Sequence, residues 1–139
     1  MRGQVWYIAL LIGLMCFIRF GLSVFGYATP QLFMEEIGIS LSSNPQMPYA
    51  IRAWAIRDMV ISILVVLADK TMVKILLFGC IAIDFTDIIS AYLSGRLGAF
   101  EGDNWLLMLT STAIAALILE LGAIFLLYKE EILEKAKKP

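Results

Sequence analysis

The sequence predicts an all-α integral membrane protein with a single transmembrane domain, residues 1–139. The expected architecture is a four-transmembrane-helix bundle with a short outer interfacial helix and a cytosolic C-terminal helical extension. Of the 139 residues, 60% are hydrophobic and 17% are charged, and the mean hydropathy is +0.84. A soluble domain holds about 45–50% apolar and about 25% charged residues, and its core is too small to bury this much apolar surface. Membrane lipids are therefore expected partners.

Composition also excludes several classes of function. The net charge of −1 argues against nucleic-acid binding, which requires basic patches. The chain contains no histidine, so bis-histidine haem, the usual zinc and copper sites and the Ser-His-Asp triad are excluded. No other set of acid, base and nucleophile is visible in the sequence. We therefore expect no enzyme, no catalytic residue, no metal and no cofactor.

Four apolar stretches are long enough to cross about 30 Å of hydrocarbon, which requires about 20 helical residues each. They must be helical because unpaired backbone groups in lipid cost several kcal/mol. The first stretch contains Arg19 and is longer than the core of a signal peptide, so we expect it to be a retained span. The predicted spans are residues 5–25, 49–67, 72–93 and 105–128.

The connections follow from turn and cap residues. The segment 28–48 is the only long connection, and its Thr29-Pro30 pair has the form of an N-cap followed by proline at the first helical position. Gly38 ends the apolar periodicity that follows. We therefore expect a short helix on the outer surface. Beyond the fourth span, residues 129–138 are charged and helical in pattern, so they are expected to extend that helix into the cytosol.

Basic residues orient the spans, because Lys and Arg are retained on the cytoplasmic side. With four crossings, both termini and the short loop 68–71 share one side, whereas the opposite side offers only Arg96 and Arg52. Both termini are therefore expected in the cytoplasm. The basic residues on their side are Arg2, Lys70, Lys74, Lys129, Lys135, Lys137 and Lys138.

Ionisable side chains within the predicted spans are the most informative residues. A charge at the bilayer centre costs at least about 2.5–3.5 kcal/mol. At 1.5 Å per residue, those in the spans lie about 12–21 Å from the cytoplasmic ends of their helices, in one central layer. We therefore predict a single buried charge cluster inside the bundle, with Arg52 at its edge. Its members are Arg19, Arg57, Asp58, Asp84, Asp87 and Glu120.

Helix geometry suggests how the cluster is paired. Adjacent residues on a helix point about 100° apart, so Arg57 and Asp58 are expected to pair with different helices. We expect Arg57 to meet Asp84 and Asp87. Arg19 is expected to meet Asp58 or Asp87.

The charges of the cluster do not balance. Four carboxylates face two arginines, so two carboxylates are in excess, or one if Arg52 reaches in. A proton, a cation or a basic side chain of another subunit would neutralise the excess. Asp84 and Asp87 alone lack the further carboxylates of a magnesium site. Three interpretations stay open: charges that hold helices together, a proton or ion path, and a site for a ligand or partner.

The run Arg52-Ala53-Trp54-Ala55-Ile56-Arg57-Asp58 in the second predicted span, followed by Asp84 and Asp87 in the third, resembles the small four-helix DoxX-like membrane proteins. The likeness is greatest to their uncharacterised bacterial and archaeal branches. It implies the four-helix fold and a prokaryotic plasma membrane. Because some members of that group accompany membrane redox enzymes that act on quinones, it also suggests an accessory role.

The sequence therefore predicts a non-catalytic accessory or structural subunit of a larger membrane complex. Such a complex would be a respiratory or other oxidoreductase, photosynthetic or monooxygenase assembly. Other membrane subunits are then expected partners, together with contact to a quinone or lipid. Trp54 and Phe78 are candidates for stacking on a quinone or pigment. The alternative is an independent small membrane carrier or binder that uses the buried carboxylates for a proton, a cation or a lipid-like ligand.

Overall fold

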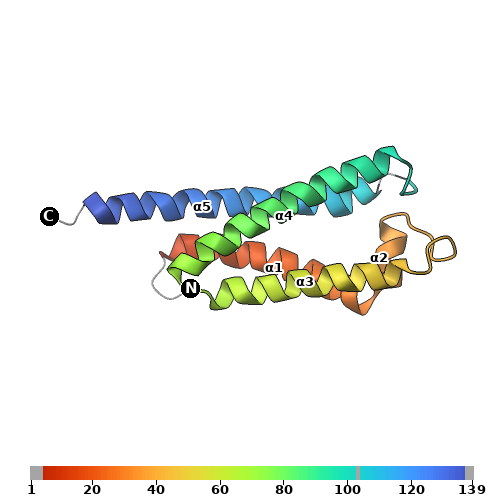
Figure 1. Cartoon of the computed structure of the whole chain (residues 1–139), viewed down its shortest axis with the longest axis horizontal. Helices are drawn as coiled ribbons and strands as arrows, with labels where there is room; N and C mark the ends of the chain where they lie inside the picture. The colour runs from red at the N-terminus through yellow and green to blue at the C-terminus, as the bar shows by residue number, and fades with distance from the viewer. Residues whose placement is uncertain (1–4, 103, 137–139) are drawn as a thin grey trace.

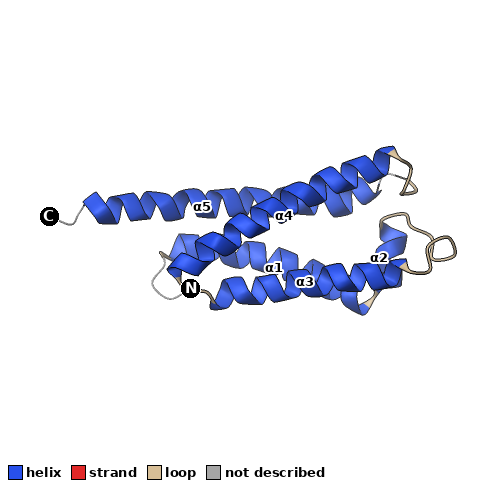
Figure 2. Ribbon diagram, viewed as in Figure 1, coloured by secondary structure: helices blue, strands red, loops and turns tan. Residues whose placement is uncertain are grey.

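A computed structural model describes residues 5–102 and 104–136 of the chain. Within these residues the structure consists of helices and loops, with no strand (Figure 2), which confirms the all-α prediction. The elements, in chain order, are α1 (Trp6–Ala28), α2 (Pro30–Glu36), α3 (Met47–Leu67), α4 (Lys70–Arg96), the π-helix η1 (Leu106–Ser111) and α5 (Thr112–Ala136).

Two of the four predicted spans have the length and apolar character of a membrane helix. These are α1, with 23 residues, and the continuous helix formed by η1 and α5, with 31 residues. The other two predicted spans coincide with α3 and α4, which are long helices but lack an apolar stretch of that kind. Both carry ionisable side chains near their middles, among them Asp58 and Asp84.

The long helices pack as two neighbouring pairs (Figure 1). One pair is α1 with α3, and the other is α4 with α5. The pairs are joined mainly by contacts of α1 with α5, whereas contacts between α3 and α4 are sparse. At one end the chain folds back through α2, and we call this the α2 end. The predicted C-terminal extension is helical through Ala136 and projects at the opposite end, while residues 137–138 of the prediction lie outside the described part.

The predicted short outer helix is α2, which begins after Thr29 with Pro30 at its first position. The Thr29 hydroxyl donates back to the Phe25 carbonyl at 2.9 Å instead of capping α2. Phe33 and Met34 are buried, and the Phe33 ring lies 5.5 Å from the Trp54 ring of α3. α2 therefore packs into the α2 end of the bundle through its apolar face.

Two apolar cores lie on either side of a polar layer. The larger core fills the half of the bundle away from α2 and includes Ile12, Leu77 and Leu127, all fully buried. The smaller core lies under α2 and is built around Phe33 and Ile51. Between them, buried ionisable side chains face one another from several helices. The fold therefore places these buried charges at one level along the helices, as predicted by counting 1.5 Å of helix per residue.

The end opposite α2 carries a second set of ion pairs, at the surface. Lys70 of α4 lies 2.8 Å from Glu134 of α5, and Lys74 of α4 pairs with Glu131. Lys135 also reaches Glu131 within α5. Exposed pairs of this kind contribute about 0–1 kcal/mol each. They align α4 with α5 but do not set the arrangement of the bundle.

Gly38 joins the two loops at the α2 end. The Glu101 N–H donates to the Gly38 carbonyl at 2.8 Å. Gly38 has φ +72°, and a Cβ added there would lie 2.0 Å from the Glu101 carbonyl oxygen. Only glycine has both the conformational freedom and the absence of a side chain that this contact requires. The loop after α2 is thereby held against the loop after α4.

Replacing Gly38 with alanine is expected to destabilise the fold more than the same change at Gly98. Both residues have φ +72°, so both variants carry the left-handed cost of about 1–2 kcal/mol. A Cβ at Gly98, however, meets no atom within 4 Å. Thermal unfolding in detergent, followed by circular dichroism, measures the difference. Equal losses in the two variants would contradict the close contact at Gly38.

Candidate functional site

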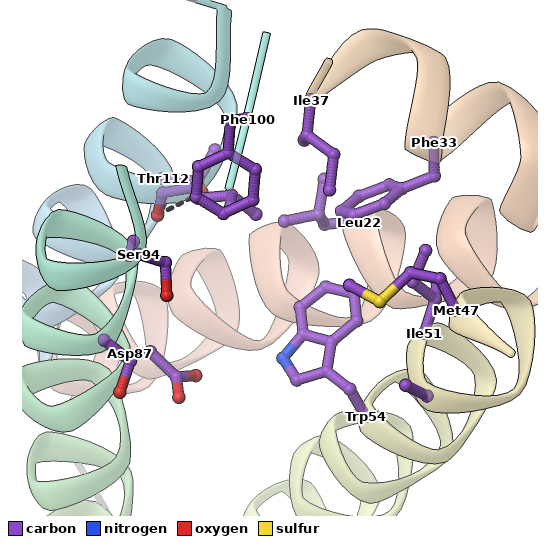
Figure 3. A pocket seen from close by; sticks show the side chains of 14 residues that line it. Leu22, Phe33, Ile37, Met47, Ile51, Trp54, Asp87, Ser94, Phe100 and Thr112 are labelled. Atoms are coloured by element: carbon purple, nitrogen blue, oxygen red, sulfur yellow. Dashed lines mark hydrogen bonds between the residues drawn. The ribbon is translucent and has the colours of Figure 1, made fainter. Parts of the chain in front are cut away.

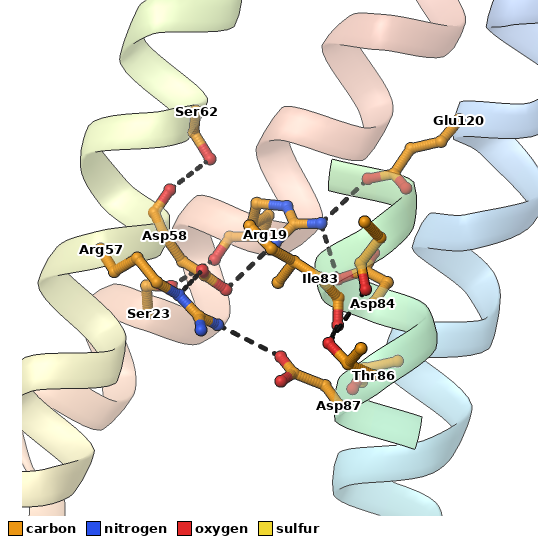
Figure 4. Close-up of polar contacts among 12 residues, drawn as sticks. Arg19, Ser23, Arg57, Asp58, Ser62, Ile83, Asp84, Thr86, Asp87 and Glu120 are labelled. Atoms are coloured by element: carbon orange, nitrogen blue, oxygen red, sulfur yellow. Dashed lines mark hydrogen bonds and ion pairs between the residues drawn. The ribbon is translucent and has the colours of Figure 1, made fainter. Parts of the chain in front are cut away.

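Arg19 lies inside the bundle with its side chain only 3% exposed. Its guanidinium reaches Asp84 Oδ1 at 2.6 Å, Glu120 Oε1 at 2.9 Å and Asp58 Oδ2 at 3.3 Å (Figure 4). Arg19 comes from α1, and the three carboxylates come from α4, α5 and α3. We call these four residues the Arg19 cluster. It ties all four long helices together at one level.

Local sequence explains why these side chains face inward. Glu120 is fully buried and shares a face of α5 with Ala116 and Ala123, the small-residue stripe that allows close helix approach. Ser23 and Ser62 are also buried, and each hydroxyl donates to a carbonyl four residues earlier in its own helix. The polar layer therefore contains small side chains around the larger charged ones.

Arg57 forms a second, more exposed group beside the Arg19 cluster. Its Nε–H donates to Asp58 Oδ1 at 3.0 Å, and its Nη2 donates to Asp87 Oδ2 at 3.2 Å. The side chains of Arg57 and Asp87 are 41% and 39% exposed, whereas that of Asp58 is 6% exposed. Asp58 therefore bridges the two arginines, one buried and one partly exposed.

The observed pairing corrects the sequence prediction. Arg57 was expected to meet Asp84 and Asp87; the contact with Asp87 is confirmed, but Asp84 pairs with Arg19 instead. Arg57 was also expected to pair away from Asp58, yet it contacts that residue directly. The physical reason is the length of the arginine side chain. Although neighbouring Cα–Cβ bonds point about 100° apart, the Arg57 guanidinium is far enough from its backbone to contact the adjacent Asp58. The prediction that Arg19 meets Asp58 or Asp87 agrees with the structure for Asp58.

Arg52 stays apart from the cluster. Its Nε–H donates to the Tyr27 carbonyl at 3.3 Å. It lies five residues before Arg57 on α3, which is about 7.5 Å along the helix axis. Arg52 therefore supplies no charge to the Arg19 cluster, and the predicted excess is two carboxylates.

The excess negative charge is concentrated around Arg19. One guanidinium there faces three carboxylates. Among the described residues, Asp84 Oδ2 and Glu120 Oε2 are buried without a hydrogen-bond partner. Both atoms are acceptors when ionised. The arrangement therefore can hold a proton, a cation or a hydrogen-bond donor.

A cavity of about 320 Å³ lies at the α2 end, next to this polar layer (Figure 3). Figure 3 shows Asp87 and Ser94 on one side and the Trp54 indole on the other. A smaller cavity of about 40 Å³ reaches the Arg19 cluster and shares Asp87 and Trp54 with the larger one. We call the larger space the outer cavity. Its polar lining residues are Asp87, Ser90, Ser94 and Thr112, and its aromatic ones are Phe33, Trp54 and Phe100.

The π-helix η1 leads into the wall of the outer cavity. It is followed by Thr112, whose hydroxyl donates to the Met108 carbonyl at 2.5 Å. Before it, the Trp105 ring stacks on Phe100 at 5.3 Å and lies over Gly95, where a Cβ would approach the ring to 2.2 Å. π-helical turns occur frequently at functional sites because they shift side chains out of helical register.

Sequence reasoning named some of these residues and missed others. Trp54, a predicted candidate for ligand contact, lines the outer cavity, whereas Phe78 is not among its described lining residues. Ser90 and Ser94 were missed, although with Asp87 they recur at i, i+3 and i+7 on one face of α4. Nothing in the helical periodicity indicated that α2 and the loop after α4 would complete the wall.

Comparison with known proteins found no matching family model, no matching curated protein and no matching solved structure. The resemblance to DoxX-like proteins therefore stays a prediction. The two features of the structure that bear on function are the Arg19 cluster and the outer cavity.

Replacing Arg19 with methionine is expected to cost about 3–5 kcal/mol, because Asp84 and Glu120 would lose their cation and Asp58 would lose one of its two. The same change at Arg57 is expected to cost less, because Asp58 keeps Arg19 as its partner and the Arg57 side chain is 41% exposed. Unfolding of the purified variants by increasing fractions of a denaturing detergent measures both. If the two variants unfold together, the Arg19 cluster does not hold the bundle.

Proposed function

We propose that this chain is a non-catalytic accessory subunit of a larger membrane complex. In this proposal it forms a four-span bundle of the DoxX-like type, and the Arg19 cluster fixes the arrangement of its helices. The proposal is supported by the contrast between the buried charges of the bundle and its apolar outer surface. The Arg19 cluster faces inward, whereas the sides of α1 and α5 expose apolar side chains such as Phe17, Ile118 and Phe125.

The observation that carries the proposal is the exposure of Arg57. This residue lies at the level of the buried cluster, and its side chain is 41% exposed. It is not among the described lining residues of the outer cavity or of the smaller one, so its exposed part opens into neither of them. An exposed charge at this depth in lipid is costly. A neighbouring subunit that covers α3 and α4 would remove that cost.

Four spans are supported by helix length and by the distribution of basic residues. α3 and α4 contain 21 and 27 residues, which at 1.5 Å each is about 30 and 40 Å, enough to cross the hydrocarbon. Lys70, Lys74 and Lys129 lie at the end opposite α2. By the positive-inside rule, these lysines favour a cytoplasmic location for that end. The central carboxylates of α3 and α4 are paired inside the bundle, as intramembrane charges require.

Purification from native membranes in a mild detergent is expected to yield the chain in a stoichiometric complex with larger subunits. Arg57→Met should reduce the recovered partners several-fold while the chain itself stays folded. The matched control is Arg52→Met, because Arg52 is an arginine of the same helix that bonds only the Tyr27 carbonyl among the described residues. A small particle in the unmodified protein, or equal loss in both variants, would overturn the accessory role.

Single cysteines test the number of spans. Ser42 lies in the loop at the α2 end, and Thr71 lies at the start of α4 at the opposite end; both are exposed. With four spans, Ser42→Cys should react with a membrane-impermeant maleimide in intact cells, and Thr71→Cys only after the cells are opened. The native Cys16 and Cys80 are buried and give the background. Labelling of both positions from outside would show that α3 does not cross, which contradicts four spans.

A further inference from the structure

We propose that the outer cavity binds a small hydrophobic amine, with its ammonium group beside Asp87 and its apolar body against Trp54 and Phe33. This inference does not rest on the accessory role, because it concerns the cavity side of the Arg57–Asp87 pair. It depends on three features of the site: the shape of its lining, the sign of its charge and its size.

The lining is divided into a polar side and an apolar side. Asp87, Ser90 and Ser94 belong to one face of α4, and Thr112 follows η1 on the same side. The opposite side is formed by Trp54 and Phe33, whose rings lie 5.5 Å apart, together with aliphatic residues of α3. Figure 3 shows the Asp87 carboxylate directed toward the cavity that the indole also faces. A ligand with one polar end and an apolar body matches this division.

The charge at the end of the outer cavity that borders the Arg19 cluster favours a cationic ligand. The six ionisable residues of the polar layer carry two more carboxylates than arginines. Asp84 lines the smaller cavity, its side chain is 6% exposed, and its Oδ2 has no hydrogen-bond partner among the described residues. Asp87 uses Oδ2 for Arg57. An ammonium group supplies donors and positive charge to such a site, whereas a carboxylate or sulfate ligand would be repelled.

Aromatic lining strengthens the preference for a cation. The Trp54 indole borders both cavities, so it lies beside the carboxylate end of the site. A cation over an indole face gains about 0.5–2 kcal/mol, most when water is excluded. A quinone would gain neither this contact nor the contact with Asp87, because its polar groups are carbonyl acceptors.

The size of the cavity selects a compact ligand. At about 320 Å³ it lies near the lower limit of small-molecule sites, which span about 300–1,000 Å³. A phospholipid with two acyl chains would not fit, and its phosphate would face Asp87. The ligand class is therefore an amine on a single apolar body, without phosphate.

Fluorescence quenching of Trp54 tests the proposal. The unmodified chain, in lipid nanodiscs, is titrated with an alkylamine brominated near its head group and with the alcohol of the same chain length. Bilayer concentrations are matched by measured partitioning, and the signal of Trp54→Phe is subtracted to remove Trp6 and Trp105. We expect the amine to quench at an at least about tenfold lower concentration than the alcohol. Equal quenching by both probes would overturn the proposal.

Two substitutions with opposite expected effects on amine quenching test whether Asp87 binds the ammonium group. Asp87→Asn should abolish the preference for the amine and leave quenching by the alcohol unchanged. Arg57→Met should strengthen amine quenching several-fold, because it removes the cation that now occupies Asp87 Oδ2. A purely structural role of the pair would weaken binding in both variants. The proposal fails if either variant leaves the preference for the amine unchanged.

Two further measurements test the size of the outer cavity and whether the ammonium group comes from a free amine or from a lipid headgroup. Ala50→Phe adds a bulky side chain to the apolar wall of the outer cavity without changing a charge, so it should weaken quenching by both probes. A short-chain phosphatidylethanolamine carries the same ammonium with a phosphate and is expected not to displace the amine. Displacement by this phospholipid would reject the amine class and identify a lipid headgroup instead. Because none of these measurements involves a partner subunit, their failure would leave the accessory role untouched.

Discussion

The rest of the structure depends on one guanidinium that faces three carboxylates in the middle of the bundle. Helices in lipid gain little from apolar contacts with one another, because acyl chains are as apolar as their side chains. In the proposed four-span bundle, a buried ionic contact among four helices supplies the missing selectivity, since separating them leaves buried carboxylates without their cation. The planar fork of arginine suits this task better than lysine would, because it offers five donors in fixed directions to carboxylates from α3, α4 and α5.

The same contact sets the character of the cavity above it. The Arg19 cluster contains more negative than positive charge, and Asp58 connects it to the Arg57–Asp87 pair, whose own charges balance. The outer cavity begins where this pair ends, so its deep end is acidic and its remaining wall is apolar. The loops at the α2 end close the structure there, because the contact of Gly38 with Glu101 holds them together.

Much of the fold and part of the site could be predicted from the sequence. Runs of apolar residues located the long helices, Thr29-Pro30 and Gly38 located α2, and a count of residues placed the charges at one level. The partners of Arg57 were not predictable, because periodicity gives the direction of a Cα–Cβ bond but not the reach of the side chain or which helices are neighbours. The cavity was also hidden, since Phe33 and Phe100 reach it only after the chain folds back.

Arg57 and Asp87 relate the two proposals and also keep them separate. Each side chain is about two-fifths exposed, but only Asp87 is among the described residues that line the outer cavity. Asp87 is among the described residues that line both cavities, whereas Arg57 lines neither, so the proposed ammonium would contact Asp87 and the proposed neighbouring subunit would contact Arg57. A ligand at Asp87 competes with Arg57 for the same carboxylate, so the two sites are not independent in energy. Each can nevertheless exist without the other, because Asp58 remains a partner for Arg57.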